Sequence, residues 1–453
     1  MRKAILPIFL LVVLGAVYLM WDSDPPEISL QTPAEVGTES AIILGIEDRG
    51  RGLESVSVVI RQGDYTRKLF EKVNPVSWLP WKHSESSVQV ELGPDDWLDR
   101  QQLKEGTFTL EVSAGDAGDY GFFSDSVMQN LEMDLDRTPP GIEVLSSQHN
   151  VRRGGAESVR YRVKGDGSSS GVRVGGNSFQ GYPVEGGGAG EYAVIFVWSH
   201  EQPADVPVKI WAEDRVGNRS EITLPCQKIE RRFRNRRINV SESFIDRVTP
   251  EIIRLSPDVE EQENKLQTYL LINQDLRVLN NRRLVEVTTP VSGGIAWDEA
   301  FLQMRNSKVE ALFADHRDYY FNGEKVDEQV HLGYDLASTA QSPVEAANDG
   351  RVVFAENLGI YGNCIVLDHG LGLYSLYGHL SSMDVEPGTA VRRGEIIGRT
   401  GQTGLAGGDH LHYSMLVQGV QTNPLEWWDP GWVQLHVLQR TRASVAEDET
   451  AGS

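Results

Sequence analysis

Two short histidine-containing stretches near the C-terminal end have the residue types and spacing of a metal site. They are His331-Leu332-Gly333-Tyr334-Asp335 and Asp409-His410-Leu411-His412-Tyr413. Residues i and i+2 of a β-strand point to the same face, so His410 and His412 would present two imidazoles to one surface. His331 and Asp335 are four apart, a spacing that shares a face in either a strand or a helix. Two histidines and one carboxylate bind a catalytic zinc that keeps its fourth position open for water, so the pattern predicts a hydrolase.

The elements that must position these residues are strands. From Thr288 the sequence becomes glycine-rich, and seven of the ten histidines follow residue 300. Segments 349–354, 362–370 and 372–380 are apolar runs separated by glycines, which predicts consecutive antiparallel strands joined by turns. We therefore expect a small all-β domain with a groove.

Four motifs, in this order along the chain, resemble the lysostaphin/LytM-type zinc metallopeptidases, enzymes that cleave peptidoglycan peptides. The motifs are His331-x3-Asp335, Tyr377-Gly378-His379-Leu380, Thr400-Gly401-Gln402-Thr403-Gly404 and His410-Leu411-His412. The resemblance covers residues 286–432 and includes every signature position of the family. It implies one zinc ion per chain, bound by His331, Asp335 and His412. It also implies that His379 and His410 are catalytic histidines that do not bind the metal.

Residue chemistry supports this division of roles. Three ligands leave one zinc position for water, whose pKa falls to about 7. A neutral histidine beside this water can accept its proton and later help to protonate the leaving amine, a role that we assign mainly to His410. His379 would donate a hydrogen bond to the tetrahedral oxyanion, although the sequence allows the two roles to be exchanged.

The resemblance predicts a zinc-dependent endopeptidase that hydrolyses amide bonds in peptidoglycan stem peptides or cross-links during cell-wall remodelling. In a two-membrane envelope the expected target is a D-alanyl–diaminopimelate cross-link, whereas other family members cut glycine bridges. One alternative is a non-catalytic wall-binding or amidase-activating module, but such relatives usually lack one of the five site residues. A second alternative is an adhesive or scaffold protein that carries an incidental hydrolase. A regulatory envelope protein is a possible partner.

The N-terminus has the pattern of a membrane anchor. Eighteen uncharged residues, Ala4 to Trp21, follow Arg2 and Lys3. This length is just enough for a transmembrane helix, and the two basic residues would stay inside. We therefore expect residues 1–24 to be a single-pass inner-membrane anchor, with the catalytic domain facing the periplasm. A cleaved signal peptide is the alternative.

The middle of the chain is predicted to be spacer and support. Residues 25–136 and 137–228 show short apolar alternations broken by Gly, Asp and Pro, which favours two tandem Ig-like β-sandwiches. Residues 229–285 are expected to form a basic, helix-prone connector, in which Ser256-Pro257 begins a helix. Its arginines between 231 and 237 could contact an anionic partner or form a solvated junction.

The predicted fold class is therefore mainly β. It comprises an N-terminal transmembrane helix, two Ig-like β-sandwiches, a helical connector and a C-terminal antiparallel β metallopeptidase domain with a groove, residues 286–435. Residues 436–453 would be a flexible tail. We also expect the segment 301–323 and the connector to pack near the groove and to limit access to it.

Composition argues against a nucleic-acid-binding protein and against a disulfide-rich protein. The formal net charge of −22 argues against a nucleic-acid partner, because phosphate binding requires a basic surface. Cys226 and Cys364 are the only cysteines, so a disulfide framework is excluded. Three other histidines, His316, His369 and His436, are expected to be peripheral. Of the tyrosines, we expect most to pack in the core and some to line the groove, and the tryptophans Trp427, Trp428 and Trp432 to cover the sheet.

Overall fold

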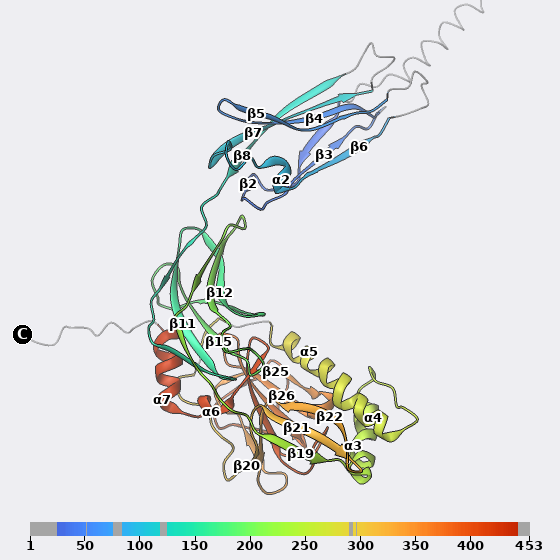
Figure 1. The fold of residues 1–453 in the computed structure, drawn as a ribbon, viewed down its shortest axis with the longest axis vertical. Helices are drawn as coiled ribbons and strands as arrows, with labels where there is room; N and C mark the ends of the chain where they lie inside the picture. The colour runs from blue at the N-terminus through green and yellow to red at the C-terminus, as the bar shows by residue number, and fades with distance from the viewer. Residues whose placement is uncertain are drawn as a thin grey trace, which may run out of the picture. The chain divides into compact units, whose positions relative to one another are not determined.

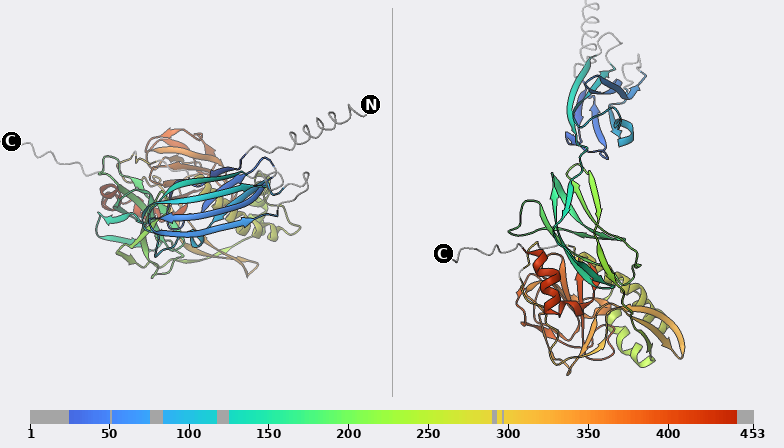
Figure 2. Two further views of the ribbon diagram at one scale, coloured as in Figure 1. Left: turned by 90° about the horizontal axis from the view of Figure 1, so that it is seen from above. Right: turned by 60° about the vertical axis from the view of Figure 1, so that its left-hand side comes forward.

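The computed structural model describes residues 25–50, 52–75, 84–117, 125–289, 293–295 and 297–442. It is mainly β, as the sequence predicts. The chain divides into two compact units, residues 1–140 with 213–219 and residues 141–212 with 220–453. Figure 1 and Figure 2 show the elements of both units. The candidate site belongs to the second unit.

The first unit is a two-layered β structure. One sheet has the order β1 (Glu27–Leu30), β3 (Ile42–Glu47) and β6 (Ser87–Leu92). The other has the order β2 (Glu35–Val36), β8 (Ser126–Leu135), β7 (Gly106–Asp116), β4 (Leu53–Gln62) and β5 (Tyr65–Val73). Alternate residues of β7 are buried, and Phe108 stacks on Trp97 of α2 (Pro94–Trp97). This two-residue period places one face of each strand in the core.

The second unit begins with two further four-stranded sheets. The first has the order β14 (Tyr182–Pro183), β15 (Glu191–Val197), β11 (Ala156–Lys164) and β9 (Gly141–Val144). The second has the order β13 (Asn177–Gln180), β12 (Gly167–Val174), β16 (Val208–Asp214) and β17 (Arg219–Thr223). A short parallel pair, β10 (His149–Arg152) and β18 (Cys226–Ile229), lies beside them.

An eight-stranded sheet forms the centre of the C-terminal part. Its order is β20 (Lys308–Ala311), β23 (Tyr334–Ala337), β31 (Leu411–Val417), β27 (Leu373–Leu380), β26 (Asn363–Asp368), β25 (Gly350–Asn357) and β29 (Ala390–Val391), and β32 (Val420–Thr422) pairs with β31. Strands β25, β26 and β27 are antiparallel neighbours, which confirms the strand prediction for residues 349–380. A small sheet of β24 (Pro343–Glu345), β30 (Ile396–Arg399) and β28 (Ser382–Met383) completes the domain.

Both faces of this central sheet are covered, so every residue of β27 and β31 is buried. On one face, Leu376 and Leu416 pack with apolar residues of the helices α3 (Glu242–Leu255) and α5 (Arg277–Val287). On the other face, Tyr413 packs in a core that also contains Phe196 of β15 and Trp427. The sheet pair of residues 141–223 and the C-terminal domain therefore share one continuous hydrophobic core.

The connector differs from the helical prediction in its first part. Residues Asn235–Asn239 form β19, which pairs in parallel with β21 (Asp315–Phe321), and β21 pairs with β22 (Glu324–His331). Tertiary contacts explain the difference, because Arg234 donates to Asp315 at 2.9 and 2.6 Å and Arg237 lies 3.7 Å over the Tyr320 ring. The chain is then helical in α3 and, after a break at residues 256–264, in α4 (Lys265–Leu271), the π-helical turn η1 (Ile272–Leu276) and α5.

The predicted helix start at Ser256-Pro257 is wrong. Ser256 is the C-terminal cap of α3, and the chain becomes helical again only at Lys265. Proline has no N–H to donate and therefore commonly follows a helix end as well as a helix start. The side chain of Asn264 provides the actual N-terminal cap, because it accepts hydrogen bonds from the amides of Leu266 and Gln267.

The C-terminal prediction also needs correction. Residues 436–441, expected to be part of a flexible tail, are helical in η3 (Gln434–Leu438) and α8 (Gln439–Thr441). These residues are fixed against β11, because His436 and Arg440 pair with Glu157, a fully buried residue of that strand. The rest of the predicted tail, residues 443–453, lies outside the described residues.

The predicted inner-membrane location is corrected by the structure. Among the residues that the structure describes, no helix is both long enough and apolar enough to cross a membrane. The single-pass location and the periplasmic orientation derived from it are therefore not supported. The segment 1–24, from which they were predicted, lies outside the described residues.

Candidate metal centre

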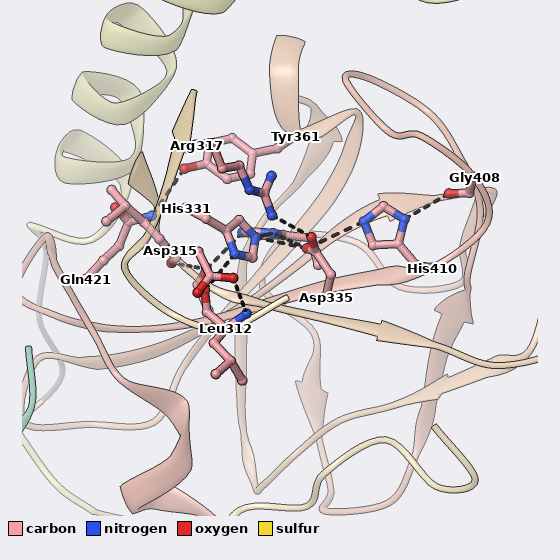
Figure 3. A network of polar contacts seen from close by, with 12 residues as sticks. Leu312, Asp315, Arg317, His331, Asp335, Tyr361, Gly408, His410 and Gln421 are labelled. Carbon is pink, nitrogen blue, oxygen red and sulfur yellow. Dashed lines mark hydrogen bonds and ion pairs between the residues drawn. The ribbon is translucent and has the colours of Figure 1, made fainter. Parts of the chain in front are cut away.

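The three predicted metal ligands meet in the structure. His331 Nε2 lies 2.9 Å from Asp335 Oδ1 and 3.1 Å from His412 Nδ1, and His412 Nδ1 lies 3.1 Å from Asp335 Oδ1 (Figure 3). Ligand atoms bound tetrahedrally to zinc are about 3.3 Å apart, given bond lengths of about 2.0–2.1 Å. These atoms could therefore hold one metal ion with only small adjustments.

Strand pairing and one bend bring the ligands together. Asp335 in β23 is the direct antiparallel partner of His412 in β31, whereas His331 ends β22 in a different sheet. The four-residue spacing therefore spans two strands, and not one strand or helix as the sequence suggested. The bend needs Gly333, because a Cβ there would lie 2.6 Å from both His412 Cε1 and Ser414 Oγ.

Hydrogen bonds outside the triad orient both imidazoles. His331 Nδ1 donates to the Leu312 carbonyl at 3.0 Å. Ser414 Oγ donates its one proton to the Leu332 carbonyl at 2.7 Å. Its hydrogen bond with His412 Nε2, at 3.0 Å, must therefore be one that it accepts. These partners fix the proton of each ring on its outer nitrogen, so His331 Nε2 and His412 Nδ1 keep free lone pairs. Such outer contacts are typical of histidines that bind metals.

Charges at the triad suit a divalent cation. Burial would raise the pKa of Asp335, but its interactions with His331, His410 and His412 hold it well below its ordinary value. Burial lowers the pKa of His331, and it lowers that of His412 to about 4. The second carboxylate oxygen, Asp335 Oδ2, accepts from Arg317 Nη2 at 2.9 Å. The site thus combines one carboxylate with two neutral imidazoles, the protonation states that zinc requires.

The two other predicted histidines stand beside the triad. His410 Nε2 lies 3.5 Å from Asp335 Oδ1, and its Nδ1 donates to the Gly408 carbonyl at 2.8 Å. Burial lowers the pKa of His410, but the hydrogen bond and charge of Asp335 outweigh this effect and leave it raised. The ring of His379 lies 4.8 Å from that of His410, and its Nδ1 donates to the Thr403 carbonyl at 2.8 Å.

His379 has an unusual backbone. Its φ is +61°, in the left-handed region that a non-glycine residue rarely adopts. The residue lies where the pairing of β26 and β27 shifts register, between Asn363↔Leu380 and Ile365↔Tyr377. A bulge of this kind redirects a side chain next to a site. Here it lets His379 line the cavity although β27 is a central strand, and burial lowers its pKa well below the ordinary value.

Two cavities meet at the triad. One has a volume of about 360 Å³ and the other of about 340 Å³, and both are lined by Arg277, Arg317, His331, Tyr361 and His412. The connector lines the first cavity through α4, η1 and α5 and the second through α5, as expected for a segment packed near the groove. Residues 310–319 of the predicted 301–323 segment also line the first cavity.

Motif reading missed five residues of the site: His200, Arg277, Leu312, Arg317 and Tyr361. None belongs to a recognisable motif, and all lie before or between the signature segments in the chain. Tyr361 carries one weak signal, a tyrosine between glycines in Gly359-Ile360-Tyr361-Gly362, and it is the last residue of the short helix η2 (Gly359–Tyr361). Its hydroxyl donates to Asn281 Oδ1 at 3.0 Å, and its ring lies 5.5 Å from that of His412.

The three histidines expected to be peripheral differ in their environments. His316 is exposed and lines the second cavity. His369 is buried, with Nε2 2.7 Å from Ser375 Oγ, so it is a structural residue and lies apart from the triad. His436 lines neither of these cavities, as expected, and it pairs with the buried Glu157 at 2.9 Å.

The predicted aromatic residues follow the expected division. Tyr319 lines the first cavity, whereas Tyr374, Tyr377 and Tyr413 are buried in the core. Trp428 packs against the sheet, with its ring 5.7 Å from that of Tyr413.

Comparison with known proteins places this site in a family. Residues 329–424 match Peptidase family M23. The chain is 40% identical over 97 residues to the DD-carboxypeptidase/endopeptidase Mpg of Neisseria meningitidis serogroup B, covering 21% of this chain and 22% of that protein. It is 40% identical over 96 residues to the peptidoglycan DD-endopeptidase ShyA of Vibrio cholerae, with the same coverage. The chain thus spans about a fifth of the length of these curated relatives.

A relative with a different role also matches. The chain is 37% identical over 106 residues to the murein hydrolase activator EnvC of Escherichia coli, covering 23% of this chain and 25% of that protein. Among solved structures, a putative peptidase M23 from Pseudomonas aeruginosa is 18% identical, with a TM-score of 0.40 and coverage of 61% of this chain and 94% of that one.

Proposed function

We propose that this chain, whose residues 329–424 form a domain of peptidase family M23, is a zinc-dependent endopeptidase. It would act on amide bonds in peptidoglycan stem peptides or cross-links. The observation that carries the proposal is the convergence of His331 Nε2, Asp335 Oδ1 and His412 Nδ1 beside two further histidines. The relatives named as peptidoglycan DD-endopeptidases support the substrate class.

His331, Asp335 and His412 would hold one zinc ion. When bound, the ion supplies a Lewis acid that polarises the scissile carbonyl and lowers the pKa of water to about 7. Arg317 keeps Asp335 Oδ2 occupied, which leaves Oδ1 free to face the ion. Leu312 and Ser414 keep the imidazole lone pairs pointing inward.

His410 and His379 would move the protons. Each donates its Nδ1–H to a backbone carbonyl, so each neutral ring has an unprotonated Nε2. His410 Nε2 is closer to the triad and would accept the proton of the attacking water, then pass it to the leaving amine. His379 would stabilise the oxyanion, and it can donate from Nε2 only after that atom has gained a proton. The two roles could still be exchanged.

The proposed division of the remaining chain follows the sequence boundaries. Residues 25–136 would act as a spacer, and residues 137–228 and 229–285 would support the peptidase domain. A regulatory envelope protein remains a proposed partner.

The similarity to a murein hydrolase activator favours a second candidate function, a non-catalytic module that acts on other wall hydrolases. The presence of all five site residues favours the enzyme, because a module of this kind needs neither zinc nor proton transfer.

Metal analysis combined with digestion of purified sacculi tests the proposal. Wild type should contain one zinc ion and release muropeptides. His331→Ala should lose zinc and activity, whereas His410→Ala should keep zinc and lose activity. His316→Ala, which removes an exposed histidine outside the triad, should keep its zinc. Muropeptide release by both His331→Ala and His410→Ala would refute the mechanism, and an inactive, zinc-free wild type would favour the activating module.

A further inference from the structure

Arg277 stands where the two cavities meet. It lines both of them, together with the ligands His331 and His412. Arg277 is the first residue of α5 and lies outside the matched family region of 329–424. Its position next to the triad is therefore a property of this chain's connector.

All but one of the acidic side chains that line the cavities have cationic partners. In the first cavity these pairs are Glu310–Lys308, Asp315–Arg234 and Asp335–Arg317. In the second cavity, Lys325 pairs with both Asp318 and Glu328, and His200 lies 3.6 Å from Glu201. The exception, Glu201, is exposed, and no lining carboxylate among the described residues forms an ion pair with Arg277.

The guanidinium of Arg277 makes only neutral contacts. Its Nε donates to the Asn273 carbonyl at 2.9 Å and its Nη2 donates to Asn273 Oδ1 at 2.5 Å. Asn273 in turn donates to Asp327, which lines neither cavity. Among the described residues, no carboxylate lies within ion-pair distance of Arg277. A half-buried arginine without an anion, in a chain of net charge −22, indicates a site for an anionic group.

The second cavity offers further polar groups without partners. His200 lines it with a side chain that is only 8% exposed, and its buried Nε2 has no hydrogen-bond partner among the residues described. Asn281 also lines this cavity, and its Oδ1 is used by the Tyr361 hydroxyl, which leaves its amide nitrogen to donate. Buried polar atoms normally have partners, so these groups point to a polar ligand.

We propose that Arg277 binds a free carboxylate of the substrate peptide, the one on the carbon that bears the scissile amide nitrogen. This inference rests on the proposed function and specifies its substrate. A diaminopimelate cross-link carries such a carboxylate, whereas a glycine bridge does not. The planar guanidinium suits a carboxylate, and partial burial reduces screening by salt. Asn281 and His200 are neutral groups that bind the adjoining peptide. The connector thereby takes part in substrate selection.

Two synthetic cross-linked peptides test this subsite. One is a D-alanyl–diaminopimelate dimer with the free carboxylate, and the other has the same carboxylate converted to an amide. The full-length zinc-loaded wild type should show a kcat/KM about ten- to hundred-fold higher for the free acid, the ratio expected for hydrogen bonds to a charged group. In Arg277→Gln this ratio should fall to about one, and Arg277→Lys should restore part of it.

Arg282→Gln is the matched control, because it removes an exposed arginine from the same helix outside both cavities. It should keep the wild-type ratio. Both kcat/KM values are measured on the same protein sample, so their ratio does not depend on the folded fraction. If Arg277→Gln only disturbs the fold, the ratio will stay at the wild-type value, and that result would overturn the subsite.

Calorimetric binding of both peptides to the His410→Ala full chain, with and without Arg277→Gln, measures the same preference without turnover. A wild type that cleaves both peptides equally would refute the subsite and leave the proposed function intact. A wild type that cleaves neither peptide would refute the proposed function for this bond. In that case equal binding of the two peptides would also refute the subsite, whereas tighter binding of the free acid that Arg277→Gln abolishes would support it.

Discussion

Glu426 couples the stability of the second unit to pH. It lies in α6 (Pro424–Trp427), its side chain is 8% exposed, and it accepts a hydrogen bond from the Ala156 amide at 3.1 Å. Burial raises its pKa from 4.5 to about 7, although the Ala156 hydrogen bond and nearby arginines oppose the rise. The close approach needs Gly155, where a Cβ would lie 2.5 Å from Glu426 Oε2. Glu426 thus joins β11 to the peptidase domain.

The raised pKa makes ionisation costly in the folded state. Between pH 4.5 and 7 the folded chain binds this proton more tightly than the unfolded chain, so stability falls as pH rises through this range. A rise of 2.5 pKa units corresponds to about 3 kcal/mol. Glu426→Gln keeps the acceptor for the Ala156 amide and removes the charge. We therefore expect the variant to match wild type below pH 4.5 and to be more stable by about 3 kcal/mol at pH 8.

Urea denaturation of the full chain at pH 4.5, 6 and 8 measures this difference. The transition of the second unit should be followed, together with hydrogen exchange at the Ala156 amide. Glu356→Gln removes an exposed carboxylate from the same unit and should show no comparable pH dependence. If the stability difference between Glu426→Gln and wild type were the same at pH 4.5 and 8, the assignment of a buried, proton-retaining carboxyl would be wrong.

Three further substitutions probe the contacts around the site and its support. Ser414→Ala removes the acceptor for His412 Nε2 and should weaken zinc binding about 10–100-fold, measured by competition with a chromophoric chelator. Unchanged affinity would show that this hydrogen bond does not orient the ring. Gly333→Ala places a methyl group 2.6 Å from His412 Cε1, so the zinc content of the variant should fall. A variant with a full complement of zinc would contradict the close approach of residue 333 to His412. Arg440→Ala leaves the buried Glu157 with one cation fewer and should lower the free energy of unfolding of the second unit by about 3–5 kcal/mol, measured in urea. A loss below about 1 kcal/mol would mean that His436 and the backbone are enough to stabilise the Glu157 carboxylate.

Local pattern and motif order predicted the candidate metal-binding residues and three strands of the central sheet. The alternation of apolar and polar residues and the glycine turns predicted β25, β26 and β27, because side-chain period and turn chemistry are local properties. The two-residue spacing of His410 and His412 placed both imidazoles in one cavity. The boundaries of the connector were not predictable in the same way, because Arg234 and Pro257 have different effects in different tertiary contexts.

The sequence by itself determined which atoms can bind zinc, since residue type sets ligand chemistry. Only the tertiary structure decided what surrounds them. Leu312 comes from the loop before β21, Arg317 from β21, Arg277 from α5 and His200 from the turn after β15. These contacts depend on tertiary packing, in which α5 covers one face of the central sheet and β15 packs on the other. Packing between segments far apart in the chain leaves no periodic trace in the sequence.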